Sequence, residues 1–379
     1  MARVTVSPTS IEVPALSTAH SHAFQRAMRG TSQRRGANPN DDFWSWRGHM
    51  YRAAAALTPE SIYDISRVAF RELFLAGVRT VGEFHYVQHQ ENGTPYAQRT
   101  LLSERVIEAA RTEGLRISLL RVAYHRAGPG REREPAQRRF CDDTVDEVLS
   151  DIDTLRVKYE NDPNVRIGVA PHSVRAVPPA WLSPLHEYAK NHRLPFHMHV
   201  AEQSREVDEC VEETGKRPVE LLADRGILDE RFVAVHATNL LEYEVRLMGE
   251  ANAFACICPT TERDLGDGLG PIGPLRAAGA RLCTGIDSHV ITDPIEELRS
   301  LETHERLRTR SRVTFAPPSN LSPAEQLWIE GSQNGALACG FSDEGGTVTI
   351  SRAHPLLQLV DDAALLDAIV FSGNSSLFL

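Results

Sequence analysis

Two histidines lie two residues apart in the stretch LSTAHSHAFQRAMRG, where an apolar run turns polar. In an extended chain, side chains two residues apart point to the same side, so His20 and His22 can reach one ion. Neutral imidazole and carboxylate are the usual zinc ligands, and a catalytic zinc lowers the pKa of a water molecule to about 7. An isolated His-x-His motif is weak evidence for a metal site, because many histidines only satisfy local carbonyls or pack in a core.

Other apolar runs end in the same residue types. The full set is His20 and His22, His172, His197 and His199, His236, and Asp287. In α/β barrels, catalytic groups lie at the carboxyl ends of the strands, where the open mouth forms. The sequence therefore predicts a metal site there, with His20, His22, His199 and Asp287 as ligands and His197 outside the ligand set.

The elements that must position these residues alternate between short apolar runs and longer amphipathic segments. Strands are predicted at 13–20, 78–84, 116–122, 165–171, 194–200, 231–237, 252–259 and 281–287. Helical patterns lie between and after them, at 101–114, 143–159, 239–252, 295–310 and 322–340. Eight strands alternating with helices predict an α/β fold, a (β/α)8 TIM-like barrel. A doubly wound open sheet would give a similar pattern, and only the strand count favours the barrel.

The remaining segments define the expected domain organisation. We expect a remnant N-terminal β element at 1–13, the barrel at 14–342, and a C-terminal tail with a reduced β element at 343–379. The polar and aromatic segment from Thr31 to Tyr51 is too long for an ordinary connection, and we interpret it as a functional loop.

Composition limits the class of partner. Lys and Arg total 41 against 51 Asp and Glu, giving a formal charge of −10, which argues against nucleic acid or anionic membrane as partners. No apolar run is long enough to span a membrane, and the first residues lack the pattern of a signal peptide. We expect a cytoplasmic enzyme acting on a small molecule. The 6 scattered cysteines are interpreted mainly as reduced core residues.

Ordered motifs at almost every strand end carry a resemblance to a known family. They are HSHAFQRAM, EFHY, APHSVRAV, FHMHVAEQ, VHATN, CPTTERDLGDG and GIDSHV, between His20 and Arg310. Together they resemble the N-formimino-L-glutamate deiminases of the amidohydrolase superfamily. The resemblance implies one divalent metal per chain, zinc above all, held by the predicted ligands, with no lysine at the fourth strand end to bridge a second ion. It also implies that Glu202 moves protons, that His236 stabilises the reacting centre and that Asp287 adds base character.

The same resemblance implies hydrolysis of N-formimino-L-glutamate to N-formyl-L-glutamate and ammonia, a step of histidine breakdown. The substrate is a dicarboxylate, and the planar fork of arginine grips a carboxylate bidentately. The positions that match the family's substrate contacts are Arg47 and Arg175, with Gln25, Tyr86 and His172 beside them. Ser288, beside Asp287, is a further candidate for substrate contact, with packing as the equal alternative.

Two rival hypotheses stay open at this point. One is a deaminase acting on another amidine or an aminated heterocycle. The other is a catalytically silent scaffold, which predicts losses among the ligands and Glu202, yet all these positions are filled. Members of the superfamily usually carry a terminal β-sandwich, which is expected to be reduced or truncated here. A homodimer is common among such proteins, but the altered ends leave the assembly open.

Overall fold

The computed structural model describes residues 4–33, 41–315 and 322–378. Eight parallel strands form one sheet in which each strand pairs with the next along the chain. They are β3 (Leu16–Ser21), β4 (Val78–His85), β5 (Arg116–Ala123), β6 (Val165–Pro171), β7 (Phe196–Val200), β8 (Phe232–His236), β9 (Phe254–Ile257) and β10 (Arg281–Thr284). The predicted α/β barrel is confirmed, and the open-sheet alternative is wrong, because the first and last strands meet.

That meeting point lies at the mouth of the barrel. The backbone N–H of His22 donates to the Asp287 carbonyl at 2.9 Å, and the N–H of Asp287 donates to the His20 carbonyl at 3.1 Å. The barrel is therefore closed by the backbone of three of the predicted metal ligands. This seam fixes their relative position independently of any side-chain contact.

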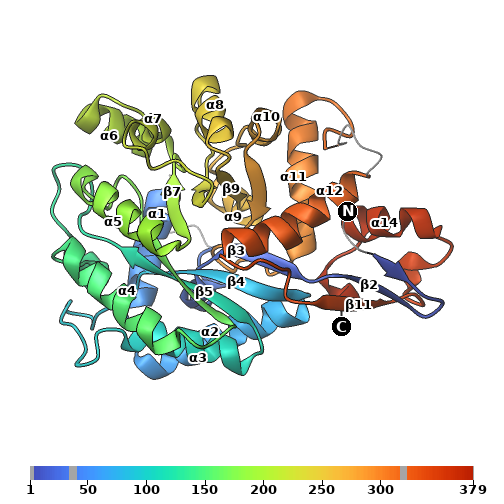
Figure 1. Cartoon of the computed structure of the whole chain (residues 1–379), viewed down its shortest axis with the longest axis horizontal. Coiled ribbons are helices and arrows are strands. Elements are labelled where there is room, and N and C mark those ends of the chain that lie inside the picture. The colour runs from blue at the N-terminus through green and yellow to red at the C-terminus, as the bar shows by residue number, and fades with distance from the viewer. Residues whose placement is uncertain (1–3, 34–40, 316–321, 379) are drawn as a thin grey trace.

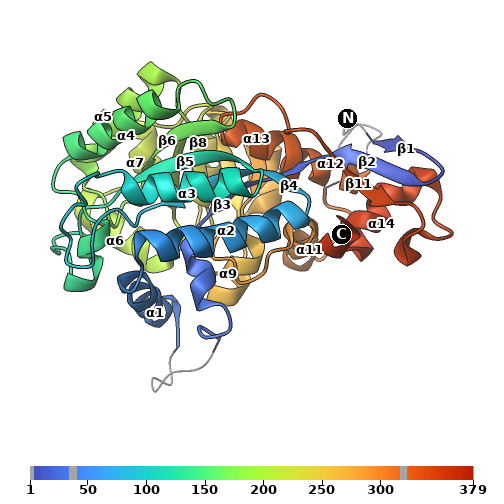
Figure 2. The ribbon, with the colours of Figure 1, turned by 90° about the horizontal axis from the view of Figure 1, so that it is seen from below.

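Helices surround the sheet on its outer side (Figures 1 and 2). Those between barrel strands are α1 (Phe43–Ala55), α2 (Pro59–Leu75), α3 (Leu101–Thr112), α4 (Val145–Tyr159), α5 (Pro179–His192), α6 (Ser204–Thr214), α7 (Pro218–Asp224), α8 (Glu242–Glu250), α9 (Pro259–Leu265) and α10 (Ile272–Ala278). Those after β10 are α11 (Pro294–Thr309), α12 (Pro323–Ile329), α13 (Gly335–Ala338) and α14 (Leu365–Ser372). In the part of the chain that the structure describes, no helix is long and apolar enough to cross a membrane.

The predicted loop from Thr31 to Tyr51 is partly wrong, because α1 begins inside it at Phe43. Asp42 caps this helix, and its side chain accepts hydrogen bonds from the N–H groups of Trp44 and Ser45. The capping box outweighs the aromatic and polar composition that argues against a helix. Residues 34–40 of the predicted loop lie outside the described residues.

A second, smaller sheet lies at one side of the barrel, at the right of Figure 1. It contains β1 (Thr5–Val6), β2 (Ser10–Pro14) and β11 (Thr347–Ser351), and β2 pairs antiparallel with both neighbours. The predicted first barrel strand at 13–20 therefore divides at Ala15 between the two sheets. Residues 343–378 supply one strand to this sheet and also form α14, which the sequence did not predict.

Candidate active site

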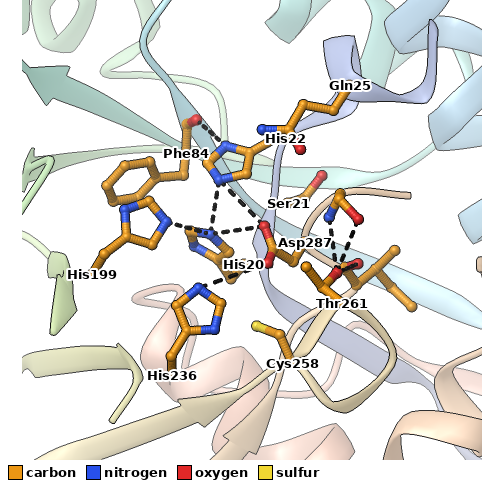
Figure 3. A network of polar contacts seen from close by, with 12 residues as sticks. His20, Ser21, His22, Gln25, Phe84, His199, His236, Cys258, Thr261 and Asp287 are labelled. Carbon is orange, nitrogen blue, oxygen red and sulfur yellow. Dashed lines mark hydrogen bonds and ion pairs between the residues drawn. The ribbon is translucent and has the colours of Figure 1, made fainter. Parts of the chain in front are cut away.

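Three imidazoles converge at the mouth of the barrel (Figure 3). His20 and His22 come from the end of β3 and its following residue, and His199 comes from β7. The Nε2 atom of His20 lies 3.1 Å from the Nε2 atoms of both His22 and His199. Asp287 approaches the same point, with Oδ1 at 3.3 Å from His22 Nε2 and 3.5 Å from His20 Nε2. The structure thus brings together all four predicted ligands.

Hydrogen bonds on the far side of two of the rings show that the Nε2 atoms of His22 and His199 carry no proton. His22 Nδ1 lies 2.9 Å from the Phe84 carbonyl, and His199 Nδ1 lies 3.0 Å from the His172 carbonyl. A carbonyl only accepts, so both Nδ1 atoms carry the proton and both Nε2 atoms present lone pairs to His20. One proton on His20 can satisfy only one of them. A cation bound by all three rings resolves this conflict, so the residues fit a divalent metal.

Burial holds the ligands in the protonation states that a metal needs. Loss of water lowers the pKa of His20 to about 3 and also lowers the pKa of His22 and His199. Burial alone would raise the pKa of Asp287, but the hydrogen bond from His20 and the surrounding imidazoles lower it. Neutral imidazoles and an ionised carboxylate are the forms that bind zinc.

His236, at the end of β8, lies beside this cluster and faces three carboxylates. Its Nε2 atom is 3.7 Å from Glu202 Oε1 and 3.8 Å from Asp287 Oδ2, and its Nδ1 atom is 3.3 Å from Glu262 Oε1. Burial acts to lower the pKa of His236, but these carboxylates outweigh it and raise the pKa to about 10. The ring is therefore suited to donate a proton or hydrogen bond to a reacting group.

The backbone is strained at two of these positions. His236 has φ 70° and Asp287 has φ 56°, in the left-handed region that side chains other than glycine rarely adopt. Gly285 allows the close approach behind them, because a Cβ atom there would lie 2.7 Å from His20 Cβ and 2.8 Å from Cys258 Sγ. Such strain persists where surrounding structure over-determines it, commonly at functional sites.

A pocket extends from the cluster toward α1. It is lined by His22, Gln25, Phe43, Trp46, Arg47, Met50, Tyr51, Tyr86, Tyr124, His172, Arg175, His199, Glu202, His236, Leu265 and Asp287. Five of the six predicted substrate contacts are in this wall. The sixth, Ser288, lines a separate small cavity, and its hydroxyl lies 3.0 Å from Thr261 Oγ1. His197 is also elsewhere, with its Nε2 at 2.8 Å from the Ala338 carbonyl.

The two arginines in the pocket differ in their partners. Arg175 is buried and donates from Nη2 to Glu202 Oε2 and from Nε to Glu206 Oε2, each at 3.0 Å. Arg47 is half-buried and lies over the rings of Trp44 and Tyr51, at 4.7 Å and 5.5 Å from their centroids. Among the described residues no carboxylate pairs with Arg47. A dianionic ligand therefore meets one uncommitted cation and one that carboxylates already hold.

Several residues around the site were not predicted from the sequence. Glu83 accepts hydrogen bonds from the Ser21 hydroxyl at 2.5 Å and the Ala23 N–H at 2.8 Å, and burial raises its pKa to about 8. Glu262 accepts from the Cys258 N–H at 2.8 Å and faces His236. The signal for Glu83 is an acid inside an apolar strand, whereas Glu262 carries no comparable signal.

Comparisons with known proteins agree with this geometry. The model of the amidohydrolase family matches residues 11–353. Formimidoylglutamate deiminase from Pseudomonas aeruginosa is 38% identical over 373 residues, covering 96% of this chain and 81% of its own. The chain therefore belongs to the amidohydrolase family.

Solved structures with this fold include two informative neighbours. An amidohydrolase from Brucella melitensis superimposes with a TM-score of 0.87 and 34% identity, covering 98% of this chain and 87% of its own. An adenosine deaminase from Xanthomonas campestris with bound zinc has a TM-score of 0.78 and 20% identity, covering 97% of this chain and 77% of its own. At that identity, the second comparison supports the fold alone.

Proposed function

We propose that this protein is a zinc-dependent deiminase that hydrolyses N-formimino-L-glutamate to N-formyl-L-glutamate and ammonia, a step of histidine breakdown. One observation carries the proposal. A single pocket joins the cluster of His20, His22, His199 and Asp287 to two arginines, in a chain that is 38% identical to a formimidoylglutamate deiminase. The metal cluster suits hydrolysis of a carbon–nitrogen bond, and the arginines suit a substrate with two carboxylates.

The metal would be held by His20, His22, His199 and Asp287. When bound, it supplies an activated water molecule for attack on the amidine carbon. In the proposed reaction Glu202 carries both protons of the attacking water to the departing nitrogen, the first as the water attacks and the second as the carbonyl forms, so that the C–N bond breaks and ammonia leaves. His236 donates a hydrogen bond to the charge that develops at the reacting centre, and Glu262 orients its ring through Nδ1.

The carboxylates would be held at the other end of the pocket. Arg47 is the first anchor in this proposal, since no carboxylate of the described residues occupies it. Arg175 supplies the second cation, and Gln25, Tyr86 and His172 complete the wall. Gln25 Nε2 donates to Tyr86 Oη at 2.9 Å, so these two side chains orient each other. Ser288 remains a candidate for substrate contact and requires a rearrangement to reach this pocket.

The test is ammonia release by the metal-replete protein from three compounds in parallel: N-formimino-L-glutamate, N-formimino-L-aspartate and a neutral formamidine. We expect selective release from the glutamate compound, because the chain is 38% identical to a formimidoylglutamate deiminase. Equal release from all three would remove the dicarboxylate assignment. No release from any, with about one bound metal per chain, would favour the alternative of a deaminase for another amidine or an aminated heterocycle.

Three further expectations belong to this proposal. Metal analysis of the isolated protein tests zinc against other divalent ions, which a His3Asp set also binds. A cytoplasmic location follows from a role in amino-acid breakdown, and cell fractionation tests it. The homodimer suggested by the family resemblance stays a prediction, which sedimentation of the purified protein checks.

A further inference from the structure

Glu206 lies outside the pocket wall yet is connected to both ends of the site. It comes from the first turn of α6 and is fully buried. Its Oε1 atom accepts a hydrogen bond from the Ala201 N–H at 2.8 Å, and its Oε2 atom accepts from Arg175 Nε at 3.0 Å. One carboxylate therefore holds the backbone between His199 and Glu202 and also one edge of a pocket cation.

Both contacts of Glu206 are at positions that need support. Ala201 has φ 51°, a left-handed conformation unusual for a residue with a side chain, at the turn between His199 and Glu202. Arg175 is a buried cation whose Nη2 atom reaches Glu202 Oε2 at 3.0 Å. Without Glu206, the guanidinium would have only Glu202 as a carboxylate partner among the described residues.

Burying another carboxylate here is costly. Loss of water raises the pKa of Glu206 to about 7, although Arg175 and the Ala201 N–H act in the opposite direction. An apolar residue of similar size would avoid this cost, since buried ion pairs often contribute little net stability. The arrangement therefore indicates a role in placing Arg175 rather than in stabilising the fold.

We propose that Glu206 is a positioning residue for substrate recognition. It anchors the Nε edge of Arg175, so that the Nη2 edge can turn from Glu202 to a carboxylate of the substrate. Arg175 thereby keeps its place while Glu202 is released for proton transfer. This inference rests on the proposed function, because it assigns the second substrate carboxylate to Arg175.

The position of α1 is consistent with this role. The Arg175 guanidinium lies 5.3 Å from the ring of Phe43 and 5.7 Å from the ring of Trp44, both on α1. The aromatic rings therefore lie close to the guanidinium, whereas Glu206 holds its Nε edge through a hydrogen bond. In the proposal, the Nη2 edge changes partner while this Nε bond stays in place.

The first variant is Glu206→Gln, which keeps an acceptor for the Ala201 N–H and removes the negative charge beside Arg175. Arg175 then pairs with Glu202 alone, and substrate carboxylates compete with that pair. We expect KM for N-formimino-L-glutamate and the Kd of glutarate, a carboxylate probe without an amidine, to rise about 10-fold or more. We expect kcat/KM for a neutral formamidine to stay within about 3-fold of wild type, because it needs no carboxylate contact.

Glu213→Gln is the matched control. Glu213 is on the same helix and pairs with Arg126 through two contacts of 2.6 Å and 2.7 Å, and neither residue lines the pocket. Its loss tests the general effect of breaking an Arg–Glu pair on α6. We expect wild-type KM and glutarate affinity, with metal content unchanged in both variants.

Two results would overturn the inference. One is a Glu206→Gln protein whose KM and glutarate Kd equal those of wild type. The other is an equal loss of activity toward the glutamate compound and the neutral formamidine, which a merely structural role predicts. If Glu206→Gln does not fold, Arg175→Lys replaces it, since a lysine has no second edge to share. The Lys variant must then show the same rise in glutarate Kd.

The proposed function fails in a different experiment. If the wild-type protein releases no ammonia from N-formimino-L-glutamate, the reaction is wrong whatever the Glu206 variants do. The Kd of glutarate can then still be compared between Glu206→Gln and wild type, because its measurement needs no turnover. A 10-fold loss of that binding supports the positioning role for a dicarboxylate ligand, and unchanged binding overturns it.

Discussion

The two ends of the pocket are built from different parts of the molecule. At the metal end, the predicted ligands lie near strand ends or in the turn after β10, and backbone hydrogen bonds across the closing seam join His20, His22 and Asp287. At the other end, one helix outside the barrel supplies five wall residues, namely Phe43, Trp46, Arg47, Met50 and Tyr51. The metal end is thus part of the barrel, whereas much of the anion end is an addition to it.

The packing of the two ends differs in the same sense. The predicted metal ligands are at most 5% exposed, while Trp46 and Arg47 are half-buried. The pocket itself holds only about 40 Å³ of free volume, which is too little for an amino-acid substrate. Pocket side chains or a wall segment must therefore move when substrate enters, and α1 is the wall segment that strand pairing does not hold. We infer that the barrel fixes the chemistry and α1 adapts to the substrate.

The strongest test of the metal end, which is the rigid end in this comparison, is His199→Ala. It removes one of three converging imidazoles, so we expect loss of the metal and of activity. Several kcal/mol of transition-state stabilisation correspond to a fall of about 10³-fold or more in kcat. Metal content per chain and ammonia release are the measurements.

His197→Ala is the control for that variant. His197 lies on the same strand and is fully buried, but its ring contacts the Ala338 carbonyl. It should keep about one metal per chain. Equal metal loss in both variants would mean that β7 packing, and not ligation by His199, holds the ion.

Glu202 lies between the two ends, because it contacts both His236 and Arg175. Glu202→Gln keeps the shape of the side chain and removes its ability to accept a proton. We expect kcat to fall about 10²- to 10⁴-fold, the usual range for a general acid–base group. Retained metal content would separate this loss from damage to the cluster, and full activity would exclude Glu202 from proton transfer.

The rigid end was also the part that the sequence predicted best. Eight apolar runs predict the barrel strands, and the places of the four predicted ligands near the ends of these runs predict that they meet at one mouth. The division at Ala15 was missed because an apolar run does not show where a chain passes from one sheet to another. Asp287 was placed at the end of a strand, yet β10 ends at Thr284 and a turn with positive φ carries Asp287 to the cluster.

The anion end was predicted less completely. Helix α1 was hidden in a segment of mixed polar and aromatic composition, and only the Asp42 capping box explains its start. Tyr51 and Tyr124 line the pocket but lie far apart in the sequence, and no local pattern joins them. The pairing of Arg175 with Glu206 was not predicted for the same reason, since no sequence pattern joins an arginine in one βα loop to an acid in the next helix.

The anion end, which is the adaptable end in this comparison, is tested first by Arg47→Met. The variant removes the cation without a carboxylate partner, and a charged hydrogen bond contributes about 1.5–3 kcal/mol. We expect kcat/KM for N-formimino-L-glutamate to fall about 10- to 100-fold, mainly through KM, with metal content unchanged. Steady-state kinetics check this.

Arg52→Met controls for the loss of charge from α1. Arg52 is exposed and lines a different cavity, between α1 and residues of the 90–92 and 134–139 segments. Its removal should leave KM unchanged. A similar rise in KM in both variants would mean that Arg47 acts by long-range electrostatic attraction and not by direct contact with the substrate. Low salt would then strengthen this attraction.

The smallest expected effect concerns the contact between α1 and the barrel. Gln137 Nε2 donates to Tyr51 Oη on α1 and to Tyr124 Oη after β5, both at 2.9 Å. Gln137→Leu leaves both hydroxyls without this donor and should cost about 1–3 kcal/mol in unfolding free energy. We also expect KM to rise a few-fold, because Tyr51 is part of the pocket wall.

Gln88→Leu is the control, because it removes an equally buried amide that contacts His85 and Ser103 instead of pocket residues. If α1 is the adaptable wall, denaturant unfolding will show similar losses of stability in the two variants, while only Gln137→Leu changes KM; a shift in both would mean that the barrel itself adjusts to the substrate.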